Sequence, residues 1–114
     1  MNLLVLKSLN ERAQGVINRE PTGFEDVFLF APIYSGDSFH MRGVEGALDI
    51  IFLDKEFGVI TINRDVIPET GGASAPPSTA YAVEVKAGGA DYYGLVRGEV
   101  WVDLTNQVLN EGAL

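Results

Sequence analysis

Residues 39–63 constrain the fold more than any other part of the chain. Within this stretch, Leu48–Leu53 is a nearly continuous run of leucine, isoleucine and phenylalanine that only Asp49 interrupts. A short apolar run bounded by glycine and by charged turn residues is typical of a strand covered on both faces. We therefore predict a central strand at residues 48–53. Residues 59–63 are predicted to return antiparallel, after a turn at residues 54–58 that contains a glycine at positive φ.

The length and hydropathy of the chain indicate one domain, residues 1–114. At 114 residues with 46% hydrophobic content, the chain can bury one core of ordinary size. No stretch reaches the roughly 18 apolar residues that a membrane-spanning helix needs. The first residues lack the basic leader and small-residue cleavage site of a signal peptide. We therefore expect a cytoplasmic protein without membrane contact.

Charge and cysteine content exclude several classes of function. The formal net charge is −8, and the eight Lys and Arg residues are scattered along the chain. Binding to nucleic acid needs clustered basic residues, so we predict no nucleic-acid partner. The chain has no Cys and one His, and its carboxylates show no ligand spacing, so we predict neither a metal site nor a cofactor.

The N-terminal part predicts a strand followed by a helix. Residues 3–6 are apolar, and Ser8 followed by Glu11 is a capping-box pattern. The helix is expected to end at residue 20, because Pro21 disfavours the helical conformation before it. Gly15 inside this helix indicates the close approach of another backbone. The apolar stripe predicted to be buried consists of Leu9, Ala13, Val16 and Ile17.

The remaining segments predict an α+β fold. We expect a mostly antiparallel sheet, curled into a small barrel-like or sandwich core, with one N-terminal helix and one short helix near residues 88–95. The Gly-, Pro- and Ser-rich residues 69–78 are predicted to be a mobile surface loop, and residues 104–114 a frayed tail. The further predicted strands are residues 27–30, 38–42, 80–86 and 100–102, with residues 80–86 half-buried.

Seven short segments follow one another along the chain: residues 11–15, 18–20, 28–30, 39–42, 48–54, 83–88 and 98–99. In this order they resemble the uncharacterised prokaryotic family called domain of unknown function 192. That family has an E-R-x-x-G-L-M-x-R helix, an M-L-F-x-F strand, an F-W-M-K-N segment, a P-L-D-I-I-F-L-D strand and a V-L-E-x-x-A-G segment near a G-D turn. The resemblance extends from about residue 4 to residue 102.

The chain also departs from the family pattern. Val16 and Ile17 replace Leu-Met, Arg42 and Gly43 replace Lys-Asn, and His40 replaces Trp. Ala47 likewise replaces Pro, and Glu99 replaces Asp. The resemblance implies a small mixed fold of largely antiparallel sheet with one or two short helices. It implies no activity, because the family has none assigned.

Four charged residues lie where the resemblance is tightest: Arg19, Arg42, Asp49 and Glu84. A carboxylate inside an apolar strand needs a partner, because burying it alone costs several kcal/mol. We expect Arg19 or Arg42 to pair with Asp49 and to fix the helix against the sheet. The alternative is a polar pocket in which one arginine is free to bind an anionic group.

His40 is the only histidine, and the strand pattern places it on an exposed face with Arg42. An acid–base role would require Asp49 or Glu84 to orient its imidazole. The sequence contains no nucleophile or phosphate-loop motif, so we assign no catalytic residue and favour a protein that is not an enzyme.

We therefore predict a domain that binds a ligand or another protein through a groove near residues 39–42 and the 69–78 loop. The predicted binding residues are Arg19, His40, Arg42, Asp49 and Glu84. One alternative is a hydrolase-like enzyme that uses His40, Asp49 and Glu84. The other is a structural subunit of a homo-oligomer.

Overall fold

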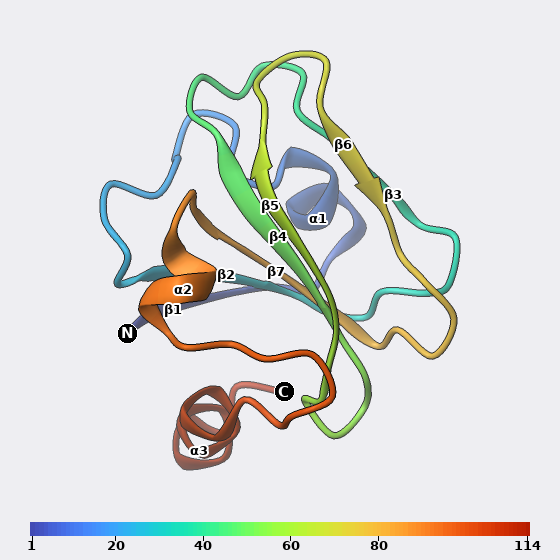
Figure 1. The fold of residues 1–114 in the computed structure, drawn as a ribbon, viewed down its shortest axis with the longest axis vertical. Helices are drawn as coiled ribbons and strands as arrows, with labels where there is room; N and C mark the ends of the chain where they lie inside the picture. The colour runs from blue at the N-terminus through green and yellow to red at the C-terminus, as the bar shows by residue number, and fades with distance from the viewer.

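A computed structural model describes all residues 1–114. Figure 1 shows a central sheet with α1 and a separate two-stranded ribbon on one side, and α2 and α3 on the other. The strands are β1 (Asn2–Leu6), β2 (Asp26–Phe30), β3 (Ser38–His40), β4 (Leu48–Leu53), β5 (Val59–Val66), β6 (Gly72–Ser74) and β7 (Tyr81–Lys86). The helices are α1 (Leu9–Gln14), α2 (Gly89–Tyr92) and α3 (Val102–Glu111).

The main sheet has the strand order β1-β2-β7-β4-β5, and β3 and β6 form the ribbon. The β1–β2 pair is parallel and the other pairs are antiparallel. The α+β class and the predominance of sheet are thus confirmed. The antiparallel barrel-like core is corrected to a mixed, open sheet with three helices, because β1 and β5 remain as its two edges.

The strand predicted from Leu48–Leu53 is confirmed as an interior strand, and every residue in it is buried. Its return partner β5 is also confirmed. Side chains alternate between two cores: Ile50 and Phe52 face α1 and the ribbon, whereas Ile51 and Leu53 face α2 and α3. Burying each such side chain stabilises the fold by about 1.5–3 kcal/mol.

Two details of the sheet differ from the sequence prediction. In the β4–β5 turn, Phe57 has a φ of 64° and Gly58 has no positive φ. Phe57 is nonetheless buried, so packing holds it in this conformation. In addition, β7 is buried on both faces rather than one, because it lies between β2 and β4 in the middle of the sheet.

The capping box of α1 is confirmed, with Ser8 Oγ accepting from the Glu11 N–H and Glu11 accepting from the Ser8 N–H. The predicted helix end at residue 20 is wrong: α1 ends at Gln14. Gly15 follows with φ 53°, a conformation that ends the helix. The predicted buried stripe is therefore only partly correct, since Leu9 is 75% exposed and Val16 is buried in the turn after the helix.

The 69–78 segment is not a simple loop, because Gly72–Ser74 forms β6 and pairs with β3. The strand predicted at residues 100–102 reduces to one isolated bridge between Val100 and Gly58. The tail predicted to fray from residue 104 is instead the helix α3. Leu104 and Val108 are buried on the sheet, four residues apart on one helix face.

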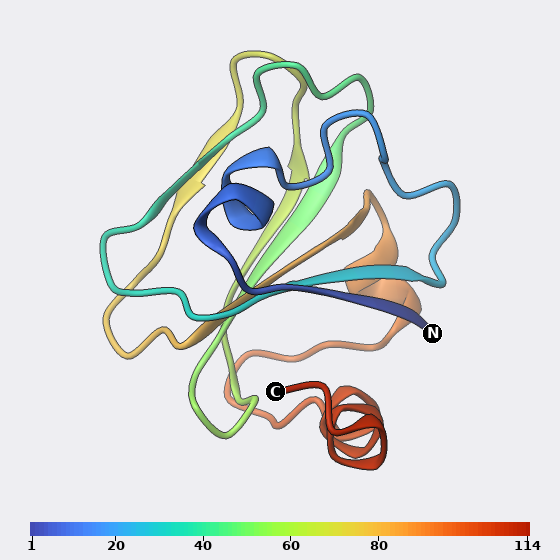
Figure 2. The ribbon, with the colours of Figure 1, turned by 180° about the vertical axis from the view of Figure 1, so that it is seen from behind.

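Figure 2 shows the same arrangement from behind, with α1 in front of the sheet and α3 below it. No helix combines the length and apolar composition that crossing a membrane requires.

Candidate functional site

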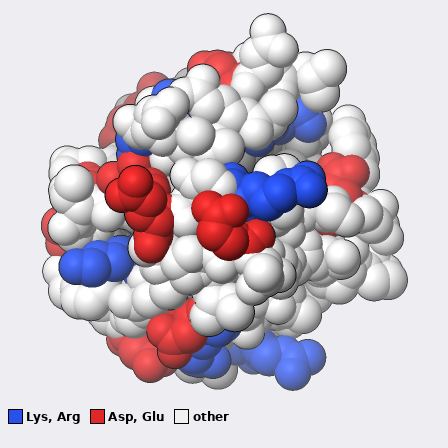
Figure 3. Space-filling model, turned by 90° about the horizontal axis from the view of Figure 1, so that it is seen from above, with Lys and Arg blue, Asp and Glu red and all other residues white.

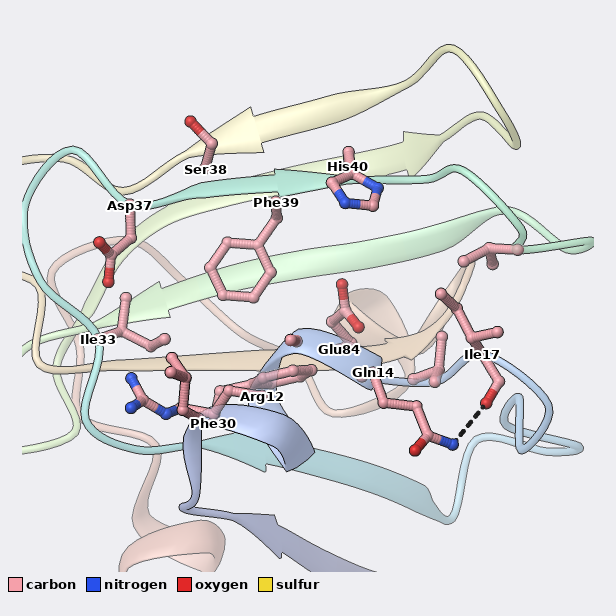
Figure 4. A pocket seen from close by; sticks show the side chains of 15 residues that line it. Arg12, Gln14, Ile17, Phe30, Ile33, Asp37, Ser38, Phe39, His40 and Glu84 are labelled. Carbon is pink, nitrogen blue, oxygen red and sulfur yellow. Dashed lines mark hydrogen bonds between the residues drawn. The ribbon is translucent and has the colours of Figure 1, made fainter.

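A cavity of about 340 Å³ lies between α1, β3 and the main sheet. One wall is α1 together with residues 15–17, and the opposite wall is β3 with Ser38, Phe39 and His40. Phe30 of β2 and Glu84 of β7 line it from the sheet. Figure 4 shows the Glu84 carboxyl pointing from β7 into the space between α1 and β3.

Glu84 is the distinctive residue of this pocket. It is 5% exposed, and its register partners are Phe28 on one neighbouring strand and Ile50 on the other. No group in the protein hydrogen-bonds to its carboxyl. The side-chain oxygen or nitrogen atoms that are fully enclosed and without a partner belong to Thr61 and Trp101. The Glu84 oxygens are not fully enclosed, so they are accessible from the cavity. Burial raises the pKa of the Glu84 carboxyl to about 8.

The end of α1 leaves room for this carboxyl. A Cβ built on Gly15 would lie 3.5 Å from the Phe30 ring and 3.8 Å from Glu84 Oε1. The predicted close approach of another backbone at Gly15 is therefore wrong, because these are ordinary contact distances and they involve a side-chain ring and a carboxyl. The positive φ of Gly15 also disfavours a larger residue there.

The other charged groups that line the pocket are bonded to backbone or face solvent. Arg12 donates from Nε to the Lys7 carbonyl at 3.1 Å and from Nη1 to the Pro32 carbonyl at 2.7 Å. Asp37 accepts the Tyr34 N–H at 2.9 Å, and His40 is exposed on β3. None of these three groups hydrogen-bonds or ion-pairs with Glu84.

The predicted arginine pairing of Asp49 is wrong. Asp49 is 1% exposed, and its carboxylate accepts the N–H groups of Asp65, Gly88 and Ala90 at 3.0, 3.1 and 3.0 Å. Gly88 and Ala90 lie at the start of α2, where backbone donors have no intrahelical acceptor. Asp65 lies beside the register shift between β4 and β5. Asp49 therefore satisfies donors that the backbone leaves free.

The two arginines predicted to pair with Asp49 lie elsewhere. Arg19 is half-buried and donates to the Gly15 carbonyl at 3.0 Å, so it holds the turn after α1. Arg42 is exposed and forms no ion pair. Neither lines the pocket.

Of the five predicted binding residues, the structure brings only His40 and Glu84 to one cavity. Asp49 bonds to the start of α2, on the opposite side of the sheet from α1. The hydrolase-like alternative with His40, Asp49 and Glu84 is therefore wrong as an arrangement of three residues, because they do not converge. The residues of the 69–78 loop do not line the cavity either.

Sequence reasoning missed Arg12, Phe30 and Ile33 as lining residues. Phe30 and Ile33 carry no sequence signal beyond hydrophobicity, because their part in the pocket depends on how the segments pack. Glu84 was among the predicted binding residues, but its burial was not predicted, because its strand was expected to be half-buried.

The fold and site define a class: a small α+β domain with an open pocket in which the only buried polar side chain is a carboxyl without a partner. The chain belongs to the family DUF192, described as "Uncharacterized ACR", whose model matches residues 1–101. All residues that line the pocket lie within this range, and α3 lies beyond it.

Two solved structures are similar to the chain. A protein of unknown function from Novosphingobium aromaticivorans is 26% identical, with a TM-score of 0.74 over 84% of this chain and 70% of that one. A protein from Sinorhizobium meliloti, provisionally described as a transcription regulator, is 20% identical, with a TM-score of 0.76 over 84% of this chain and 76% of that one. No curated protein matches the chain.

Proposed function

We propose that this domain binds a small molecule in the pocket between α1 and β3, without catalysing a reaction. The observation that carries the proposal is Glu84, a buried carboxyl that opens into the pocket and has no partner in the protein. Because its oxygens reach the cavity, a ligand bound there can hydrogen-bond or ion-pair with the carboxyl directly.

The shape and lining of the pocket support this proposal. Its volume of about 340 Å³ is near the lower end for small-molecule sites. Phe30 and Phe39 meet edge to face at 5.3 Å between ring centroids, which fixes the apolar part of the lining. Eight of its fifteen lining residues are hydrophobic, and the polar ones include Arg12, His40 and Glu84. Apolar surface therefore lies beside polar groups, as it does in ligand pockets.

The proposed site refines the groove expected near residues 39–42 and 69–78. It retains His40 and Glu84, and it replaces Arg19, Arg42 and Asp49 with the α1 residues that form the opposite wall. The description of the Sinorhizobium meliloti protein as a transcription regulator does not extend to this chain, because at 20% identity the likeness shows the fold alone.

Ala13→Trp tests the pocket directly. Ala13 is exposed and lines the cavity, so an indole at this position should fill its mouth. Asn10→Trp is the matched control, because Asn10 is exposed on the same helix and does not line the cavity. We expect fragments found by ligand-observed NMR with the parent protein to bind Asn10→Trp equally well and to lose at least tenfold in affinity for Ala13→Trp.

Fragments whose binding is the same in both tryptophan variants would refute the pocket as the binding site. The same conclusion follows if a fragment set that includes cations, anions and neutral compounds gives no hit at all.

The homo-oligomer alternative stays a prediction. Exposed Val96, Val100 and Val102 lie together in sequence before and at the start of α3, and Leu109 is exposed later in the same helix. Light scattering over a concentration series tests this alternative, and a constant monomer mass would rule it out.

A further inference from the structure

We propose that the pocket binds an organic cation, an alkyl- or arylammonium compound, whose charged nitrogen pairs with the Glu84 carboxylate. The apolar body of this compound would lie against Phe30, Ile33 and Phe39. This inference rests on the proposed function, since it names the ligand class for the same pocket.

No charged group of the protein serves as a counter-ion for the Glu84 carboxyl. The other charged or titratable groups that line the cavity are Arg12 from α1, Asp37 before β3 and His40 on β3. Arg12 already donates to the carbonyls of Lys7 and Pro32, and none of the three bonds to Glu84. A cation from outside is therefore the group that complements the ionised form of Glu84.

The free-energy cost of ionising Glu84 for such a ligand is small near neutral pH. Because burial raises the pKa of Glu84 to about 8, roughly one tenth of the carboxyl is ionised at pH 7. At pH 7 an ammonium ligand would therefore bind about tenfold more weakly than it would to a fully ionised Glu84, because the carboxyl must first be deprotonated. Because Glu84 is only 5% exposed, its carboxylate attracts a bound cation more strongly than a carboxylate in bulk water would.

The apolar lining suits the remainder of such a ligand. Phe39 meets Phe30 at 5.3 Å and Phe52 at 5.5 Å between ring centroids. Phe30 and Phe39 line the cavity together with Ile33. Aromatic faces attract cations in addition to providing apolar contact. An amine attached to a hydrocarbon group therefore matches both parts of the pocket.

The overall field of the protein also favours cations. The formal net charge is −8, which raises the local concentration of positively charged ligands. On the face shown in Figure 3, acidic and basic side chains are interspersed and form no continuous basic surface.

Two other ligand classes fit the pocket less well. A neutral compound could accept a hydrogen bond from the protonated Glu84, but it would gain nothing from the charge of the protein. An anion would have to bind in a cavity that is lined by two carboxyl groups, Glu84 and Asp37, in a protein whose net charge is −8.

Phenethylamine, phenethyl alcohol and phenylacetate share one ring and differ in charge, so they separate the three classes. We expect phenethylamine to bind best in calorimetric titrations at pH 7. It should release about 0.9 proton on binding, seen as a heat that changes with the ionisation enthalpy of the buffer. Its affinity should rise about tenfold between pH 6 and 7 and level off above pH 8.

Glu84→Gln should lower the affinity for phenethylamine at least tenfold. Glu56→Gln should leave it unchanged, because Glu56 is exposed in the β4–β5 turn and lies outside the pocket. The proton release of the parent protein provides a second readout that does not depend on any variant folding.

Equal or better binding of the alcohol or of phenylacetate would overturn the cation inference. If that binding is also lost in Ala13→Trp, the pocket itself stands and only the ligand class is wrong. Failure of all three compounds to bind would likewise overturn the cation inference. The fragment screen with the two tryptophan variants would then test the pocket independently. Phenethylamine binding without proton release would overturn it as well.

Discussion

Two carboxyl groups are buried in the main sheet, and their surroundings differ. Asp49 accepts three backbone N–H groups, whereas Glu84 accepts none. Burial without partners favours the neutral form of the Glu84 carboxyl. The two residues therefore differ in role: Asp49 stabilises the backbone around α2, and Glu84 is the group proposed to bind a ligand.

Glu84 should make the protein less stable as the pH rises. Burial raises the folded-state pKa of Glu84 from 4.5 to about 8, so the folded protein binds more protons than the unfolded chain between these values. The resulting stability is fully present below pH 4.5 and is lost as the pH rises to about 8, by on the order of 5 kcal/mol in total.

Glu84→Gln should remove this loss, because its amide stays neutral. In urea unfolding at pH 5, 7 and 9, the free energy of unfolding of Glu84→Gln minus that of the parent protein should increase with pH. A difference that is the same at pH 5 and pH 9 would contradict the buried, unpartnered state of Glu84.

Asp49→Ala should destabilise the protein by at least about 3 kcal/mol, because it leaves three backbone donors without an acceptor. Arg42→Ala should change the free energy of unfolding by less than about 0.5 kcal/mol, because Arg42 is exposed and unpaired. Urea unfolding measures both effects. Amide exchange at Gly88 and Ala90 should accelerate in Asp49→Ala alone, and acceleration in Arg42→Ala would indicate an arginine partner after all.

Among the elements, α1 and α3 cover opposite faces of the sheet and are held differently. No residue of α1 is buried, so this helix depends on its capping box and on the Arg12 bonds to the Lys7 and Pro32 carbonyls. Helix α3 instead buries Leu104 and Val108, and Gln107 donates to the Met1 carbonyl at 2.9 Å. Packing thus holds α3, and local hydrogen bonds hold α1 beside the pocket.

Leu104→Ala should lower the free energy of unfolding by about 2–4 kcal/mol, because Leu104 is fully buried on the sheet. Leu109→Ala is the matched control: Leu109 lies on the same helix, is 73% exposed, and its truncation should cost less than about 0.5 kcal/mol. Chemical denaturation compares the two variants. Similar small effects in both would mean that α3 does not dock in solution.

At the scale of the whole molecule, the sequence predicted the elements whose pattern is local. The strand Leu48–Leu53, its return partner and the capping box at Ser8 were predictable because each depends on neighbouring residues. The parallel β1–β2 pair was not, because it joins residues 24 positions apart and composition does not encode strand direction. For α3, the spacing of Leu104 and Val108 was a usable helix signal that the β-branched residues just before it obscured.

The candidate site was only partly predictable, because it is formed by segments that are far apart in the sequence. Glu84 was selected as a charged residue where the family resemblance is tightest, and His40 as the only histidine. Both line the pocket. The prediction for Asp49 was wrong because it assumed a charged side chain, Arg19 or Arg42, as the partner. The actual partners are the backbone N–H groups of Asp65, Gly88 and Ala90. Free backbone donors arise at bulges and helix starts, which become visible only once strand register is known.

The pairing of β4 with β7 aligns Asp49 with Val85 and Ile50 with Glu84, so adjacent rungs of the ladder carry the two acids on opposite faces. A slip of one position would carry the apolar side chains of the shifted strand to the wrong face, and it would break the Asp49 bonds to Gly88 and Ala90. The acids consequently penalise misaligned pairing, and they help to select a single alignment while the sheet assembles.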